Sequence, residues 1–129
     1  MNNNEKKWVS LMRLGGKMGC HQIPERSFFY KGYQFPVCAR CTGVLLSVPI
    51  SIYILKKYKF SVRVALLMSE IMLIDWGIQY LGIKESTNAR RLTTGLIGGI
   101  GFHVLYFKMI IYLIKKIYYF IGGTVNILK

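Results

Sequence analysis

Three cysteines and one histidine stand at spacings that suit metal or redox chemistry. Cys20 and His21 are neighbours, and a 16-residue spacer separates them from the pair Cys38 and Cys41. Two thiols separated by two residues can turn their sulfurs toward one point, which suits a tetrahedral metal or a redox dithiol. The set predicts a site for zinc or a similar thiolate-bound transition metal, with a Cys38/Cys41 redox pair or unconnected thiols as alternatives.

The spacer between the cysteines predicts a hairpin. Residues 28–35 are rich in aromatic residues and have Lys31-Gly32 at their centre, where a turn is expected. A hairpin brings Cys20 back toward Cys38 and Cys41. Neighbouring side chains of an extended segment point to opposite faces, so His21 joins the same metal only if the chain turns there. Three thiolates with an open fourth position, and three thiolates plus the imidazole, are both compatible with this pattern.

A second group of polar residues lies within and after an apolar segment. Asp75 and Gln79 are one helical turn apart, and a carboxylate inside such a segment by default marks a function or a specific partner. His21, Asp75 and Glu85 are the candidate catalytic residues of acid/base type. The candidate substrate-binding residues, able to hold a phosphate or carboxylate, are Arg26, Arg40, Gln79, Ser86, Asn88 and Arg91. Capping of the following helix and contact with lipid headgroups are the structural alternatives for the residues around position 88.

The composition indicates a membrane protein. The chain has 129 residues, 53% of them hydrophobic, and a formal net charge of +13. The basic residues stand between apolar blocks, and the tyrosines cluster near the block ends, as in a membrane interface. This pattern favours membrane lipids over nucleic acid as partners.

Charged residues divide the chain into an all-α membrane domain with about three transmembrane helices. The predicted segments are an amphipathic N-terminus (1–19), a Cys/His motif segment (20–41), three spans (42–58, 62–83 and 92–114) and an interfacial tail (115–129). The first span has only 15 residues between its flanking charges. These reach about 22 Å against a hydrocarbon core of about 30 Å. Gly95 and Gly99 predict close helix packing in the third span.

Three spans bring the Cys/His motif segment and the loop at residues 84–91 to one membrane face. That face carries ten Lys/Arg residues and the opposite face seven. The positive-inside rule therefore predicts a multi-pass protein of the cell membrane whose motif face is cytoplasmic. Glu70 lies on another side of the second span from Asp75 and is expected to contact Lys108 or His103 of the third.

The spaced motifs resemble a family of small bacterial and archaeal membrane proteins that is catalogued as a domain of unknown function. The resemblance covers residues 20 to about 95 and implies a shared architecture and a common site, but no activity. The matching motifs are Cys20-His21-Gln22 with Pro24, Arg26 and Ser27; Cys38-x-Arg40-Cys41-x-Gly43; Asp75 with Gln79; and Glu85-Ser86-Thr87-Asn88 with Arg91 and Gly95.

Four functions fit these features. The leading hypothesis is a metalloenzyme at the membrane surface that acts on a lipid or another anionic substrate. A metal-ion carrier or channel would pass the ion by Asp75, His103 and Glu70, and would require a homo-oligomer because three helices are few for a pore. A membrane thiol oxidoreductase would use Cys38 and Cys41 alone. A non-enzymatic adaptor or immunity-type protein would use the same face to bind a partner.

Overall fold

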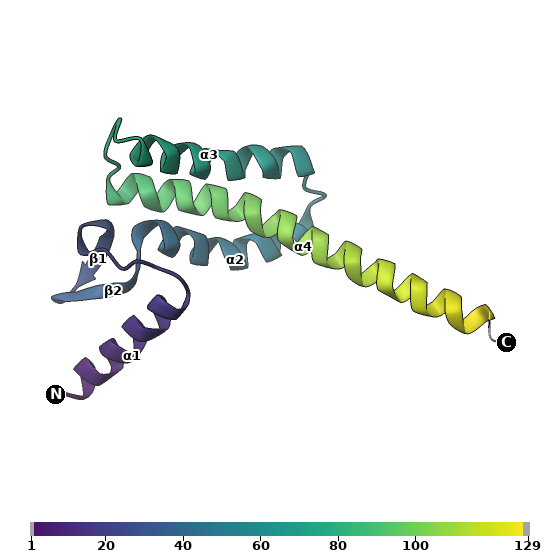
Figure 1. Cartoon of the computed structure of the whole chain (residues 1–129), viewed down its shortest axis with the longest axis horizontal. Helices are drawn as coiled ribbons and strands as arrows, with labels where there is room; N and C mark the ends of the chain where they lie inside the picture. Colours follow the sequence, from purple (N-terminus) through teal and green to yellow (C-terminus); the bar gives the residue numbers. More distant parts are fainter. Residues whose placement is uncertain (1, 128–129) are drawn as a thin grey trace.

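The chain forms an N-terminal helix, a hairpin and a bundle of three helices (Figure 1). The computed structural model describes the backbone of residues 2–127 and the side chains of residues 2–121. In chain order the elements are α1 (Asn3–Lys17), the short 3-10 helix η1 (Pro24–Arg26), β1 (Ser27–Tyr30), β2 (Tyr33–Cys38), α2 (Ala39–Lys57), α3 (Val62–Tyr80) and α4 (Asn88–Ile127). The predicted mostly helical fold is confirmed, and it includes one small antiparallel sheet.

Helix α4 is the central helix of the bundle and packs against both α2 and α3. Its glycines allow this approach. A Cβ on Gly95 or Gly99 would overlap atoms of α2, and a Cβ on Gly98 or Gly101 would overlap atoms of α3. The close packing predicted from the glycines is therefore confirmed, and α4 uses two different faces for its two neighbours.

The interior of the bundle is made of small side chains, while large apolar side chains face outward. Ser47, Ala65 and Val104 are fully buried, whereas Leu67 and Ile74 of α3 are each more than half exposed. A soluble protein would bury such side chains, but in a bilayer lipid tails cover them, and association depends on close packing of small residues.

Among the residues that the structure describes, two helices are long and apolar enough to cross a membrane: α2 over Ala39–Lys57, and α4 over Asn88–Ile121. Helix α3 has the same length as α2 but contains Arg63, Glu70 and Asp75, so the predicted span at 62–83 is not among them. The second half of α4 projects beyond the bundle (Figure 1).

Helix α4 does not end with the predicted span at residue 114. It continues through Lys115 and Lys116 to Ile127, since lysine is a good helix former and a pair of charges does not stop a helix. An interfacial position for residues 115–127 stays a prediction. Residues 128 and 129 of the predicted tail lie outside the described residues.

The hairpin follows the predicted pattern. Strands β1 and β2 are antiparallel, and Tyr30 pairs with Tyr33 across the turn. Lys31 and Gly32 both have positive φ values, 49° and 82°, as a two-residue turn of type I′ requires. At the other end of the sheet Ser27 pairs with Cys38, so the hairpin returns the chain to the start of α2.

Helix α1 packs on the hairpin and places Cys20. It ends at Lys17, and the φ of 82° at Gly19 lets the chain reverse just after the helix. The indole Nε1 of Trp8 donates to the main-chain oxygen of Gln34 at 2.8 Å. The Gln22 amide donates to the main-chain oxygens of Met12 and Pro36, both at 2.6 Å. These bonds hold the segment after α1 against β2.

Candidate metal centre and arginine cluster

The three cysteines come together at the junction of α1, the hairpin and α2. Their sulfur atoms all lie within 4.8 Å of one another. A tetrahedral thiolate site with metal–sulfur bonds of about 2.3 Å places its sulfurs about 3.8 Å apart, so each pair needs to approach by about 1 Å at most. All three thiols are free and partly buried. Cys20, Cys38 and Cys41 can therefore hold a metal ion.

Local hydrogen bonds connect the three cysteines and favour the thiolate form of Cys38. The main-chain N–H of Cys38 donates to the sulfur of Cys20 at 3.1 Å. A hydrogen bond with the Cys41 side chain lowers the pKa of Cys38 to about 5, although burial of the thiol opposes this effect. Because Cys38 is also free of any disulfide, its thiolate is available at neutral pH.

A pocket of about 220 Å³ lies beside the cysteines. The set of mutually close ligand atoms contains the three sulfurs and no nitrogen of His21. His21 is exposed and lies on the wall of the same pocket, beside the thiolates. The other predicted site residues on this wall are Arg26, Arg40, Gln79 and Arg91.

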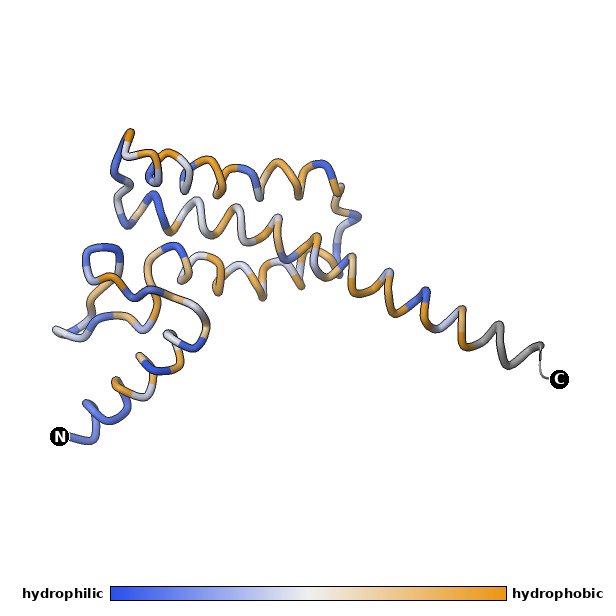
Figure 2. The backbone as a smooth tube through the Cα atoms, in the orientation of Figure 1, coloured by the Kyte–Doolittle hydropathy of each residue, from blue (hydrophilic) through white to orange (hydrophobic). Residues whose placement is uncertain are grey.

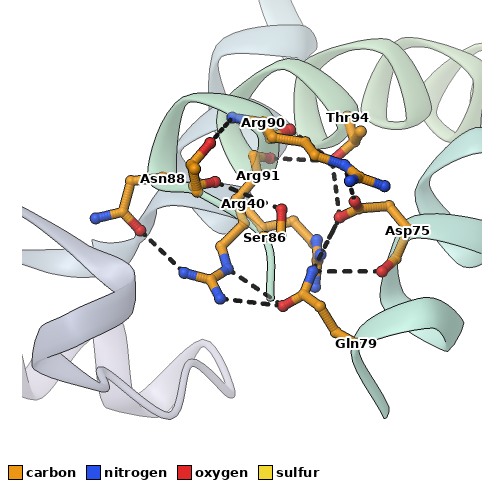
Figure 3. A network of polar contacts seen from close by, with 9 residues as sticks. Arg40, Asp75, Gln79, Ser86, Asn88, Arg90, Arg91 and Thr94 are labelled. Atoms are coloured by element: carbon orange, nitrogen blue, oxygen red, sulfur yellow. Dashed lines mark hydrogen bonds and ion pairs between the residues drawn. The ribbon is translucent and has the colours of Figure 1, made fainter. Parts of the chain in front are cut away.

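Asp75 joins the three helices of the bundle (Figure 3). Its carboxylate is 3% exposed, accepts from Arg40 of α2, and lies 2.7 Å from Nε of Arg90 in α4. Gln79 of α3 and Thr94 of α4 donate to its Oδ2 at 3.1 and 3.3 Å. Asp75 thus lines neither pocket described here and is held by side chains of all three helices, and its predicted catalytic role stays a prediction.

Arg91 is buried without a carboxylate partner. It is 7% exposed, and its Nε and Nη2 both donate to Oε1 of Gln79 at 3.2 Å. Its Nη1 donates to Oδ1 of Asn88 at 3.1 Å. Both partners are neutral amides, and the ion pairs of the described residues both end at Asp75. Gln79 therefore links Arg91 to Asp75 without neutralising it (Figure 3).

A second pocket, of about 480 Å³, lies between η1 and the loop before α4. The predicted site residues that line it are Arg26, Glu85, Ser86, Asn88 and Arg91. The Asn88 amide donates to the main-chain oxygen of Ser27 at 3.2 Å, which ties this loop to the hairpin. The two pockets share Ile23, Arg26 and Arg91, so they adjoin. The Cys/His motif segment and the loop at 84–91 therefore lie next to each other at one end of the bundle, and their predicted position at one membrane face stays a prediction.

The family described as "Predicted membrane protein (DUF2085)" matches residues 20–105. The chain belongs to this family. The match begins at Cys20, ends within α4 and contains every candidate site residue. The predicted resemblance to a membrane family of unknown function is therefore confirmed.

Two archaeal relatives of this DUF2085 chain are similar over most of it. An uncharacterized protein of Methanothermobacter thermautotrophicus is 41% identical over 93 residues, which are 67% of this chain and 82% of the relative. An uncharacterized protein of Methanocaldococcus jannaschii is 40% identical over 102 residues, 70% of this chain and 65% of the relative. No solved structure matches the chain.

Several partners in this DUF2085 site were not predicted. Arg90 and Thr94 were outside the candidate set, yet both contact Asp75. The sequence signal that could have found them is their position in the first two turns of α4, the helix that has to pass Asp75. The expected contact of Glu70 with Lys108 or His103 is wrong within the part of the chain that the structure describes. Glu70 is exposed on the outer side of α3, because five residues from Asp75 turn it away from α4.

The two basic groups expected to meet Glu70 have other partners. Lys108 donates to the main-chain oxygen of Phe60, where the loop between α2 and α3 ends. Nδ1 of His103 lies 2.9 Å from the Ser47 hydroxyl and 2.8 Å from the main-chain oxygen of Gly99. Both groups therefore support the helix packing.

Proposed function

We propose that this protein is a metal-dependent enzyme at the membrane surface that acts on a lipid or another anionic substrate. Cys20, Cys38 and Cys41 would hold a zinc-type ion. The observation that carries the proposal is the convergence of three sulfurs, from the segment after α1, from β2 and from α2, in the lining of a pocket that also contains arginines. A thiolate-bound zinc ion with an open position supplies a Lewis acid and can activate a water molecule.

The chain's own residues have distinct roles in this proposal. His21 lies on the pocket wall beside the thiolates and is the candidate proton acceptor. Arg26 and Arg91 line the same wall and would orient an anionic group by their planar guanidinium donors. Glu85 lies in the adjoining pocket and is the candidate acid. Asp75 would act through Arg40, as a positioning residue.

In the proposed membrane arrangement α3 is a third span, and the cysteines and both pockets lie at the cytoplasmic surface. Outward-facing Leu67, Leu73 and Ile74, each at least 60% exposed, support a lipid-facing α3. The ion pairs of Asp75 lower the cost of keeping its charge near the bilayer. The hydrophilic residues of the turn between α3 and α4 lie at the same end as the hairpin (Figure 2).

A membrane thiol oxidoreductase is the second candidate, because the Cys38 and Cys41 side chains are hydrogen-bonded and Cys38 has a lowered pKa. Cation transport by Asp75 is less well supported. Two guanidinium groups occupy that carboxylate, and their positive charge opposes the passage of a cation.

Metal analysis of detergent-purified protein tests the proposal. We expect about one zinc-type ion per chain, and thiolate-to-cobalt absorption after replacement of that ion by Co²⁺. Cys20→Ser, Cys38→Ser and Cys41→Ser should each abolish stoichiometric binding, whereas the matched variant His21→Ala should retain it. A metal-free wild-type protein would overturn the proposal. Thiol oxidation that survives Cys20→Ser but not Cys38→Ser would favour the oxidoreductase instead.

A further inference from the structure

Positive charge exceeds negative charge at the motif end of the bundle. Four arginines line or adjoin the pockets there. Arg40 and Arg90 pair with Asp75, but Arg26 and Arg91 belong to neither ion pair found among the described residues. Arg91 is 7% exposed, and its hydrogen-bond partners among the described side chains are neutral amides. A buried guanidinium without a counter-charge is costly, so this place suits an anion from outside the chain.

The second pocket offers that anion a site of suitable size and chemistry. Arg26 and Arg91 both line it, and its volume of about 480 Å³ exceeds what a phosphate group alone would fill. Two planar guanidinium groups can each bind two phosphate oxygens. The Ser86 side chain is 6% exposed in this lining. Within the described part of the chain its hydroxyl donates only to the main-chain oxygen of Thr87, at 3.5 Å, so it can turn to a ligand.

The same pocket also contains two carboxylates. Glu25 and Glu85 line it and form no ion pair within the described part of the chain. Ionised carboxylates only accept hydrogen bonds, and they repel a bare anion. They therefore favour a ligand that carries hydroxyl or ammonium donors next to its phosphate.

We infer that Arg26, Arg91, Ser86 and Asn88 form a binding site for a phosphate group with adjacent hydroxyl or ammonium donors. Glu25 and Glu85 receive those donors. The phosphate belongs to a lipid headgroup or to a soluble phosphorylated alcohol. The two pockets share Ile23, Arg26 and Arg91, so a phosphate bound here would lie next to the metal centre. That this ligand is the substrate of the metal centre rests on the proposed function. Binding of the phosphate does not itself require the metal.

Binding to the delipidated full chain in detergent tests the site. The probes are glycerol 3-phosphate, short-chain phosphatidylglycerol, short-chain phosphatidylcholine and inorganic phosphate. We expect glycerol 3-phosphate or phosphatidylglycerol, the two probes with free alcohol groups next to the phosphate, to bind most tightly. Which of the two does so distinguishes a soluble source from a lipid. Phosphatidylcholine, whose headgroup has no hydroxyl or N–H donor, and inorganic phosphate should bind more weakly.

Matched variants complete the test. Arg26 is exposed. Its substitution Arg26→Gln should weaken binding by about tenfold or more without lowering the melting temperature. Lys84→Gln removes the same charge from an exposed position that does not line the pocket and should leave binding unchanged. Equal binding by wild type and Arg26→Gln, or tightest binding of inorganic phosphate, would overturn the inference.

Measuring the metal content of the same protein distinguishes failure of the phosphate site from failure of the proposed function. Protein that retains its metal but binds none of the phosphates would refute this site and leave the metal centre. Metal-free protein that binds glycerol 3-phosphate or phosphatidylglycerol through Arg26 would support the site and refute the proposed function.

Discussion

The motif end of the bundle and its middle are held together by different interactions. At the motif end, a buried carboxylate, two arginines and a threonine connect α2, α3 and α4. In the middle, glycines let the helices touch. The buried hydroxyls of Ser47 and Ser51 and the partly buried ring of His103 lie within hydrogen-bond distance of one another or of main-chain oxygens. The middle is therefore internally satisfied, while the motif end keeps excess positive charge that an outside ligand can use.

The difference follows from the solvent around each region. Lipid supplies no hydrophobic force between helices, so the middle depends on close contact of small residues. The motif end includes the hairpin and the loop before α4, both of which contain hydrophilic stretches, and water or headgroups can solvate exposed charges there (Figure 2). Charges are therefore tolerated there and can serve binding.

The largest loss of folding stability is expected from Asp75→Asn. It leaves Arg40 and Arg90 without their counter-charge, and breaking a buried ion pair costs about 3–5 kcal/mol. Unfolding in detergent, followed by temperature or denaturant, measures the loss. Glu70→Gln, at an exposed position of the same helix, should change stability little. Similar losses for the two variants would show that the Asp75 network does not hold the helices together.

A smaller effect is expected from Gly101→Ala in the middle of the bundle. The added Cβ overlaps the main-chain oxygen of Ala65, and overpacking of this kind costs about 1–3 kcal/mol. The same measurement applies to Gly77→Ala, where the added Cβ meets no atom within 4 Å. That control should be neutral or more stable by up to about 1 kcal/mol, because alanine favours a helix. Destabilisation by both variants alike would contradict close packing at Gly101.

The smallest effect is expected from Ser47→Ala. It removes the hydroxyl 2.9 Å from Nδ1 of His103, and loss of such a hydrogen bond costs about 1 kcal/mol. His103 keeps a second neighbour, the main-chain oxygen of Gly99, which limits the loss. Ser61→Ala is the control, since Ser61 is exposed and makes no side-chain capping bond. Unchanged stability in both variants would mean that the middle depends on glycine contacts alone.

Local patterns made part of the fold and site predictable. The Lys31-Gly32 turn needs only two residues that accept positive φ, so the hairpin follows from its own segment. The chain must reverse its direction after each apolar helix, and this brings Cys20, Cys38 and the loop at 84–91 to one end of the bundle. The ionic partners were harder to predict. Arg40, Arg90 and Arg91 stand close together in space, and the turn of each helix about its axis decides which of them meets Asp75.

The sequence by itself therefore determined the mostly helical membrane character, the hairpin and the grouping of the three cysteines, since these depend on composition, short-range turns and chain direction. Only the tertiary structure decided that Asp75 is neutralised by Arg40 and Arg90 while Arg91 is buried against neutral amides. Electrostatic pairing depends on distances of a few ångströms between separate helices. Residue spacing along the chain does not specify such distances.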